Sequence, residues 1–226
     1  MAKKQNQPTR TKLEEFNDQL SGVEQKFEQN RKKIYTILGV LVALALGVWA
    51  FYQFYQVPRE KKAVEAIGGA DILMAQQQDS LALIEYEKVI KKYGGDQANR
   101  AKIMAGLLYY QKGDYKKAAK YLEDADAKGK VIGPMVIGLL GDCYASFEKP
   151  DLAKAMKAYD KAVDMSDNNP DLTPLFMQKK ASILREQEKY ADEAAVYQEI
   201  KDKFMSYYMQ NQLEKNHERA LAQAGK

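Results

Sequence analysis

The chain has 226 residues, of which 46% are hydrophobic and 29% charged, with six prolines and fourteen glycines. This composition excludes a fibrous or low-complexity chain and is typical of a folded protein. The formal net charge of +4 is unevenly spread: residues 1–33 hold eight basic and five acidic residues, residues 34–58 hold neither, and the rest holds 27 basic and 26 acidic residues. A nearly neutral main domain lacks the basic surface that nucleic-acid binding requires, so we expect no nucleic-acid partner.

Residues 1–33 form a polar N-terminal tail that ends in a short amphipathic helix. Thr11 and Glu14 have the spacing of a capping box, which predicts a helix start. Apolar residues then recur at intervals of three and four among charges of both signs: Leu13, Phe16, Leu20, Val23 and Phe27. This seam of two heptads fits a partner helix, from a second copy or from another membrane protein. The alternative is an amphipathic stub without a partner, since fewer than three heptads are marginal for a coiled coil.

Residues 34–55 read IYTILGVLVALALGVWAFYQFY and contain no charge. At about 1.5 Å per residue this segment spans about 33 Å, enough for a hydrocarbon core of roughly 30 Å. Arg31, Lys32 and Lys33 precede it and aromatic residues crowd its other end, as at membrane interfaces. We therefore predict a single transmembrane helix in contact with the lipid bilayer. A cleaved signal peptide would have a shorter apolar core, and a buried core helix would be less uniformly apolar.

The basic residues before the apolar segment favour a cytoplasmic N-terminus, which places the C-terminal domain on the opposite side of the membrane. Small residues recur at every fourth position within the segment, at Gly39, Ala43 and Gly47. This spacing allows two membrane helices to approach closely and so predicts a packing face, including one for a homodimer. The alternative is that these residues are simply common in membrane helices.

Residues 56–62 are a linker, and residues 63–206 contain four copies of one pattern before a final capping helix at 207–226. The clearest copy includes AKIMAGLLYYQKGDYKKAAKYLEDADAKG, which resembles the tetratricopeptide repeat, a pair of antiparallel helices in about 34 residues. The copies lie near 63–96, 99–132, 134–169 and 174–206. Residues at helix-packing positions of the repeat are Ala70, Ala82, Tyr86, Gly106, Tyr109, Ala118, Gly141, Tyr144, Ala155 and Tyr159. The predicted fold is therefore all-α: one N-terminal transmembrane helix, then an α-solenoid of about four tetratricopeptide-type hairpins and a C-terminal capping helix.

Stacked hairpins of this type form a concave surface that is lined by the first helix of each pair. Residues expected to face it, as candidates for binding a partner protein, are Ile67, Asp71, Met74, Ile103, Leu107, Tyr110, Met135, Asp142 and Arg185. This lining is mostly apolar and contains methionine, which suits extended or amphipathic segments with relaxed specificity. One subclass of the repeat holds a C-terminal carboxylate with basic and amide side chains, but Ile103 and Leu107 occupy those positions here. The alternative is that the chain's own terminal helix covers the surface.

Catalytic and metal-binding patterns are absent from the sequence. The single Cys143 and single His217 cannot form a Cys/His zinc site, and the sequence contains no phosphate-binding glycine loop, no G-x-S-x-G and no H-E-x-x-H. Adjacent acidic residues such as Asp192 and Glu193 are expected on solvated helix surfaces. We therefore expect no enzyme activity, no cofactor and no bound metal.

The order of short tail, membrane helix and small repeat domain resembles that of the YfgM-like family of bacterial inner-membrane proteins. The resemblance implies a single-pass protein of the bacterial inner membrane with a periplasmic C-terminal domain, which acts as a chaperone-like scaffold and ancillary subunit of the Sec translocon. Its implied partners are translocon subunits, a chaperone or secretory chains. Two alternatives remain: a structural subunit of another envelope or secretion assembly that holds one fixed partner, and an organelle receptor with its repeats in the cytosol.

Overall fold

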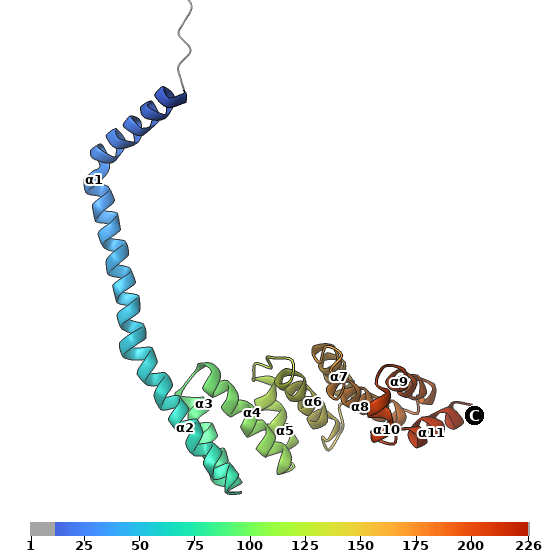
Figure 1. Cartoon of the computed structure of the whole chain (residues 1–226). Coiled ribbons are helices and arrows are strands. Elements are labelled where there is room, and N and C mark those ends of the chain that lie inside the picture. Colours follow the sequence, from blue (N-terminus) through green and yellow to red (C-terminus); the bar gives the residue numbers. More distant parts are fainter. Residues whose placement is uncertain (1–11, 226) are drawn as a thin grey trace, which may run out of the picture. The chain divides into compact units, whose positions relative to one another are not determined.

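A computed structural model describes the backbone of residues 12–225 and the side chains of residues 28 and 30–225. Within this range all the regular elements are helices (Figure 1). In chain order they are α1 (Lys12–Phe51), the π-helical η1 (Tyr52–Gln56), α2 (Val57–Ala75), α3 (Asp79–Lys92), α4 (Gly95–Gln111), α5 (Tyr115–Glu123), α6 (Ile132–Ala145), α7 (Leu152–Met165), α8 (Leu172–Glu186), α9 (Tyr190–Lys203), α10 (Met205–Gln210) and α11 (Glu214–Ala224).

The chain divides into two compact units between Arg59 and Glu60. The first contains α1 and η1, and its apolar stretch is long enough to cross a membrane by length and composition. None of that stretch is buried within the chain; Leu44, for example, is 62% exposed and Val48 69%. The side chains of the predicted heptad seam, from Leu13 to Phe27, lie outside the described residues. The predicted linker 56–62 is itself helical.

Four helical hairpins follow one another in chain order after η1 (Figure 1). Hairpin 1 is α2 and α3, hairpin 2 is α4 and α5, hairpin 3 is α6 and α7, and hairpin 4 is α8 and α9. The buried hydrophobic residues of these hairpins form three clusters, which together extend from Ile67 to Leu213. The fold is therefore a solenoid in which each hairpin buries its apolar face against its neighbours.

Each hairpin is closed by a small residue on its first helix that faces a large residue on its second. A Cβ atom at Gly106 would lie 2.7 Å from Cγ of Leu122, and one at Gly141 would lie 2.5 Å from Cε1 of Tyr159. Only glycine allows these helices to approach so closely. The corresponding small residues of the four hairpins are Ala70, Gly106, Gly141 and Ala181, and the corresponding large residues are Tyr86, Leu122, Tyr159 and Tyr197, all of them buried.

Local signals in the sequence set where the second helices begin. Gly113 has φ +77°, a left-handed conformation that ends α4 at little steric cost. Asp114 then caps α5, because its carboxylate accepts a hydrogen bond from the backbone N–H of Lys117 at 3.2 Å. Asp151 caps α7 in the same way, accepting from the N–H of Lys154 at 3.0 Å.

Acidic residues of the second helices join successive hairpins. Glu87 of hairpin 1 accepts hydrogen bonds from the hydroxyls of Tyr109 (2.8 Å) and Tyr121 (3.0 Å) of hairpin 2. Glu123 of hairpin 2 likewise accepts from Tyr144 of hairpin 3. Burial, followed by the hydrogen bond to Glu87, raises the pKa of Tyr109 and of Tyr121 to about 12, so both phenols remain protonated donors.

The C-terminal segment, predicted as one capping helix over 207–226, is instead two helices, α10 and α11. They are separated at Gln212, whose φ of +50° is incompatible with a continuous helix. Tyr208 and Leu213 are buried against hairpin 4, whereas Leu221, also expected to face it, is 55% exposed. The exposed residues of α11 also include the charged Glu214, Lys215 and Glu218, which suits a helix that ends a solenoid.

Candidate functional site

The first helices of hairpins 2, 3 and 4 together form a hollow of about 390 Å³, which we call the apolar groove. It is lined by side chains of α4, α6 and α8, and the only charged ones are Asp142 and Lys179. The complete lining is Ile103, Leu107, Ile132, Met135, Val136, Gly138, Leu139, Asp142, Leu172, Leu175, Phe176 and Lys179. The groove thus offers hydrophobic contact along most of its length.

Helix α6 forms the centre of the groove. Asp142 is the only charged residue of this helix. Ile132 and Met135 are 55% and 50% exposed, and Leu139, one turn further along, is half-buried. These residues lie three and four positions apart, so they form one stripe on the helix surface. Apolar side chains exposed in a row on a folded domain mark a surface that contacts something else.

Phe176 of α8 closes the floor of the groove and is 3% exposed. Its ring rests directly on the backbone of α6 at Gly138, where a Cβ atom would lie 2.1 Å from Cε1 of Phe176. The absence of a side chain at this position therefore sets the spacing between α6 and α8, and with it the width of the groove.

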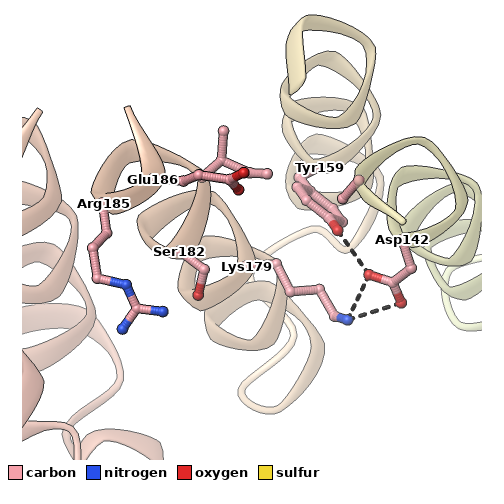
Figure 2. Close-up of a pocket in the computed structure, with 8 residues that line it drawn as sticks. Asp142, Tyr159, Lys179, Ser182, Arg185 and Glu186 are labelled. Carbon is pink, nitrogen blue, oxygen red and sulfur yellow. Dashed lines mark hydrogen bonds and ion pairs between the residues drawn. The ribbon is translucent and has the colours of Figure 1, made fainter. Parts of the chain in front are cut away.

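A polar cluster ends the apolar groove (Figure 2). Asp142 accepts a hydrogen bond from the hydroxyl of Tyr159 at 2.7 Å and two from the ammonium group of Lys179 at 2.7 and 2.9 Å. The side chains of Asp142 and Lys179 are 18% and 32% exposed, so the pair is partly shielded from water. Burial, followed by the charge of Asp142, raises the pKa of Tyr159 far above its usual value, which keeps this phenol a donor. The two charges neutralise each other at the groove's end.

Beyond this cluster lies a polar pocket of about 580 Å³, which shares Asp142 and Lys179 with the apolar groove. Ser182, Arg185 and Glu186 of α8 also line it. Figure 2 shows Arg185 and Glu186 pointing in different directions. Neither has an ion-pair partner in the part of the chain that the structure describes, so both are available to polar groups of a bound molecule.

Most of the predicted groove residues on α4, α6 and α8 line these two hollows. Ile103, Leu107, Met135 and Asp142 line the apolar groove, and Arg185 lines the polar pocket. The remaining four predicted residues do not line either of them: Ile67, Asp71, Met74 and Tyr110.

Ile67 was predicted to face the groove, and this prediction is wrong, because its side chain is 1% exposed and lies in the core. It is one helical turn before Ala70, so both face the second helix of the hairpin. Asp71 accepts a hydrogen bond from Tyr86 (2.6 Å) and pairs with Arg100 (2.6 Å), so it links hairpins 1 and 2.

Met74 and Tyr110 are half-buried packing residues. The sulfur of Met74 lies 3.7 Å from the hydroxyl of Tyr86, and the ring of Tyr110 packs edge-on against Tyr115 with centroids 5.3 Å apart.

Sequence reasoning missed several residues of the apolar groove. On α6 these are Ile132 and Leu139, and on α8 they are Leu172, Leu175 and Lys179. Their signal was present: Ile132 and Leu139 continue the spacing of three and four residues through Met135 on α6, and Leu172, Leu175 and Lys179 follow the same spacing on α8. The ion pair between Asp142 and Lys179 joins residues 37 positions apart and could not be read from spacing.

Cys143 and His217 are far from metal-binding geometry. Within the described residues, no group of three or more His, Cys, Asp or Glu side chains could hold a metal ion. Cys143 is buried, and burial raises the pKa of its thiol to about 12, so it is a packing residue and not a nucleophile.

Comparison with known proteins identifies the class of fold. A family model described as tetratricopeptide repeat matches residues 68–130, which cover most of hairpins 1 and 2. The solenoid thus consists of hairpins of the tetratricopeptide type, and this part of the predicted fold is confirmed.

A particular solved structure supports the same class. It is that of YrrB, described as a TPR protein with an unusual peptide-binding site. The likeness covers 77% of this chain and 88% of that one, with a TM-score of 0.52 and 19% sequence identity, so it bears on the fold. A comparison with curated proteins finds no match.

Proposed function

We propose that this chain is a membrane-anchored scaffold that holds apolar segments of other proteins in the apolar groove. The observation that carries the proposal is the exposed stripe of Ile132, Met135 and Leu139 on α6, flanked by apolar side chains of α4 and α8. The charges at its end are already paired, so an uncharged segment would leave none of them unsatisfied. The peptide-binding site named for YrrB, a protein of the same fold, agrees with this use of the surface.

The anchor in this proposal is the apolar part of α1. Its side chains are exposed over the whole stretch, and an exposed apolar surface of this length is stabilised by lipid and not by water. Three basic residues, Arg31, Lys32 and Lys33, precede it and support a cytoplasmic N-terminus.

The finer proposal is that the repeats face the periplasm of a bacterium and act as a chaperone-like subunit beside the Sec translocon. It is supported by the order of tail, apolar helix and repeats, which resembles the YfgM-like family. In cells with a permeabilised outer membrane, an added protease should digest residues 60–226. Survival of that part would refute the periplasmic orientation.

Photocrosslinking tests the groove directly. A photoreactive amino acid replaces Met135 in the apolar groove in one variant and Met209 on α10 in another; these residues are 50% and 61% exposed. Crosslinks to partner proteins are expected from position 135 and not from position 209. Secretory chains or translocon subunits among the products support the finer proposal, whereas one stoichiometric partner indicates a structural subunit of another assembly.

A matched pair of substitutions then tests whether apolar contact carries the binding. Met135→Lys places a charge in the groove, and Met209→Lys places the same charge on an exposed helix outside it. The first should prevent the full chain, in lipid nanodiscs, from suppressing the aggregation of an unfolded model protein, and the second should leave that activity unchanged. Equal activity of both variants would refute the proposed function.

A further inference from the structure

Hairpin 4 departs from the other three at one buried position. Four residues before the large residue of the second helix, hairpins 1 to 3 have Ala82, Ala118 and Ala155. Hairpin 4 has Glu193 at this position, and its side chain is 0% exposed. Glu193 was predicted to lie on a solvated helix surface, and its complete burial shows that this prediction is wrong. A carboxylate thus stands at a buried position where the other three hairpins have a methyl group.

Glu193 is neutralised by Arg219 of α11, whose Nη2 lies 2.7 Å from Oε1 of Glu193. Oε2 of Glu193 and Nε of Arg219 are buried and have no hydrogen-bond partner among the described residues. The pair is therefore only partly satisfied. Removing a charge from water is unfavourable unless an opposite charge meets it, so any helix that covers this face must supply a cation at this point.

Beyond this ion pair, α11 packs on α9 and Tyr208 through a small number of buried side chains. Its buried residues are His217 and Ala220, and Nδ1 of His217 lies 3.2 Å from the hydroxyl of Tyr208. The helix has 11 residues, a length that is marginal without tertiary contacts. It follows Gln212, whose φ of +50° is unfavourable for a residue with a side chain. A short helix with little buried apolar area opens more readily than the hairpins do.

We propose that the end of hairpin 4, formed by α9 and by Tyr208 of α10, is a docking site for an arginine-bearing helix, and that α11 occupies it in the isolated chain. The partner is a helix that presents an arginine to Glu193 and a small residue beside it, as Arg219 and Ala220 do. Charge complementarity selects this partner, because a helix without the cation would bury Glu193 unpaired. The site lies apart from the apolar groove and does not depend on it.

Hydrogen exchange measured by mass spectrometry on the full chain tests whether α11 opens and whether the ion pair holds it. The amides of α11 should exchange faster than those of α9, through local opening. Arg219→Ala should increase the exchange of α11 at least about tenfold, since it leaves Glu193 buried and unpaired. The Glu193→Ala chain has the alanine of the other hairpins at this position. Adding Arg219→Ala to it should alter the exchange of α11 by less than about threefold, because the effects of the two substitutions are coupled through the ion pair.

A peptide added in trans tests whether the site accepts a separate helix. The probe is a blocked, fluorescent peptide of residues 213–225, with an Arg219→Ala peptide as its control. The peptide that contains Arg219 should bind the Arg219→Ala chain. It should bind the unaltered chain at least about tenfold more weakly, because the chain's own α11 competes for the same site. The control peptide should bind neither chain, and the Glu193→Ala chain should not distinguish the two peptides.

Two results would overturn the proposal: exchange of α11 that matches α9 in every chain, or failure of the peptide to bind the Arg219→Ala chain. Self-association of the full chain that increases with concentration and competes with the peptide would support it, and would identify the partner helix as α11 of a second copy.

Discussion

Gly138→Ala should destabilise the solenoid at the point where α6 and α8 meet. The added methyl group would lie 2.1 Å from Cε1, 2.8 Å from Cδ1 and 2.9 Å from Cζ of Phe176, whereas carbon atoms pack at about 3.5–4.0 Å. Phe176 is 3% exposed, so its ring cannot move aside without displacing α8. Overpacking of this kind costs about 1–3 kcal/mol, and the large overlap favours the upper end.

The same substitution also replaces a glycine within a helix by alanine, and this replacement by itself stabilises a helix by about 1 kcal/mol. The net expectation is a free energy of unfolding lower by about 2 kcal/mol. Gly69→Ala is the matched control, because Gly69 is exposed in α2 and no atom lies within 4 Å of its added methyl group. It should raise stability by about 0.5–1 kcal/mol.

Urea unfolding of the full chain in detergent micelles, followed by circular dichroism, measures both changes. The two alanines should move the midpoint in opposite directions. A Gly138→Ala chain as stable as the unaltered one would refute the argument that this glycine sets the spacing of α6 and α8. Because Phe176 also lines the apolar groove, the destabilised chain should bind apolar peptides more weakly.

Asp142→Asn should lower the free energy of unfolding by about 1 kcal/mol, because it removes the partly shielded ion pair with Lys179; a loss equally large in 1 M salt, measured by the same urea titration, would contradict this. Peroxide should oxidise both Met135 and Met209 but weaken peptide binding only through Met135, whose polar sulfoxide would lie in the apolar groove, and Met135→Leu should protect binding. Burial lowers the pKa of His217, so the folded chain favours the neutral imidazole. Its contribution to stability is complete above about pH 6.5 and is lost as the pH falls below that value. The check is the protection of the α11 amides relative to their intrinsic exchange rate at each pH: it should be lower at pH 5.5 than at pH 7.5, and this difference should be absent in His217→Gln.

The repeats were predictable because glycine and alanine at fixed spacing have a strong steric cause: at Gly141, only a hydrogen atom fits against the facing tyrosine. The alternation of helices and turns therefore followed from sequence. The direction in which individual side chains point was harder to predict. Ile67 was assigned to the groove but faces the core, since a shift of one residue turns a helical side chain by about 100°.

Polar contacts between distant residues were not predictable. Glu193 reads as a surface acid beside Asp192, and its partner Arg219 lies 26 positions further along the chain. Lys179 similarly meets an acid 37 positions earlier. Charged residues are abundant on every helix, so spacing alone cannot select the pair that tertiary packing brings together.

The bonds between hairpins have a consequence for how such a chain could evolve. The joint between hairpins 1 and 2 uses a glutamate and Tyr109, and the joint between hairpins 2 and 3 uses a glutamate and Tyr144, which occupies the corresponding position of its own hairpin. Loss or duplication of hairpin 2 would therefore rebuild the same bond. The joint to hairpin 4 is different, because Asp160 pairs there with Lys180 at 2.5 Å. Hairpin 2 is thus the module that can be lost or repeated at these joints, because it carries both the tyrosine and the glutamate of the bond, whereas hairpin 4 is suited to one place, at the end of the series.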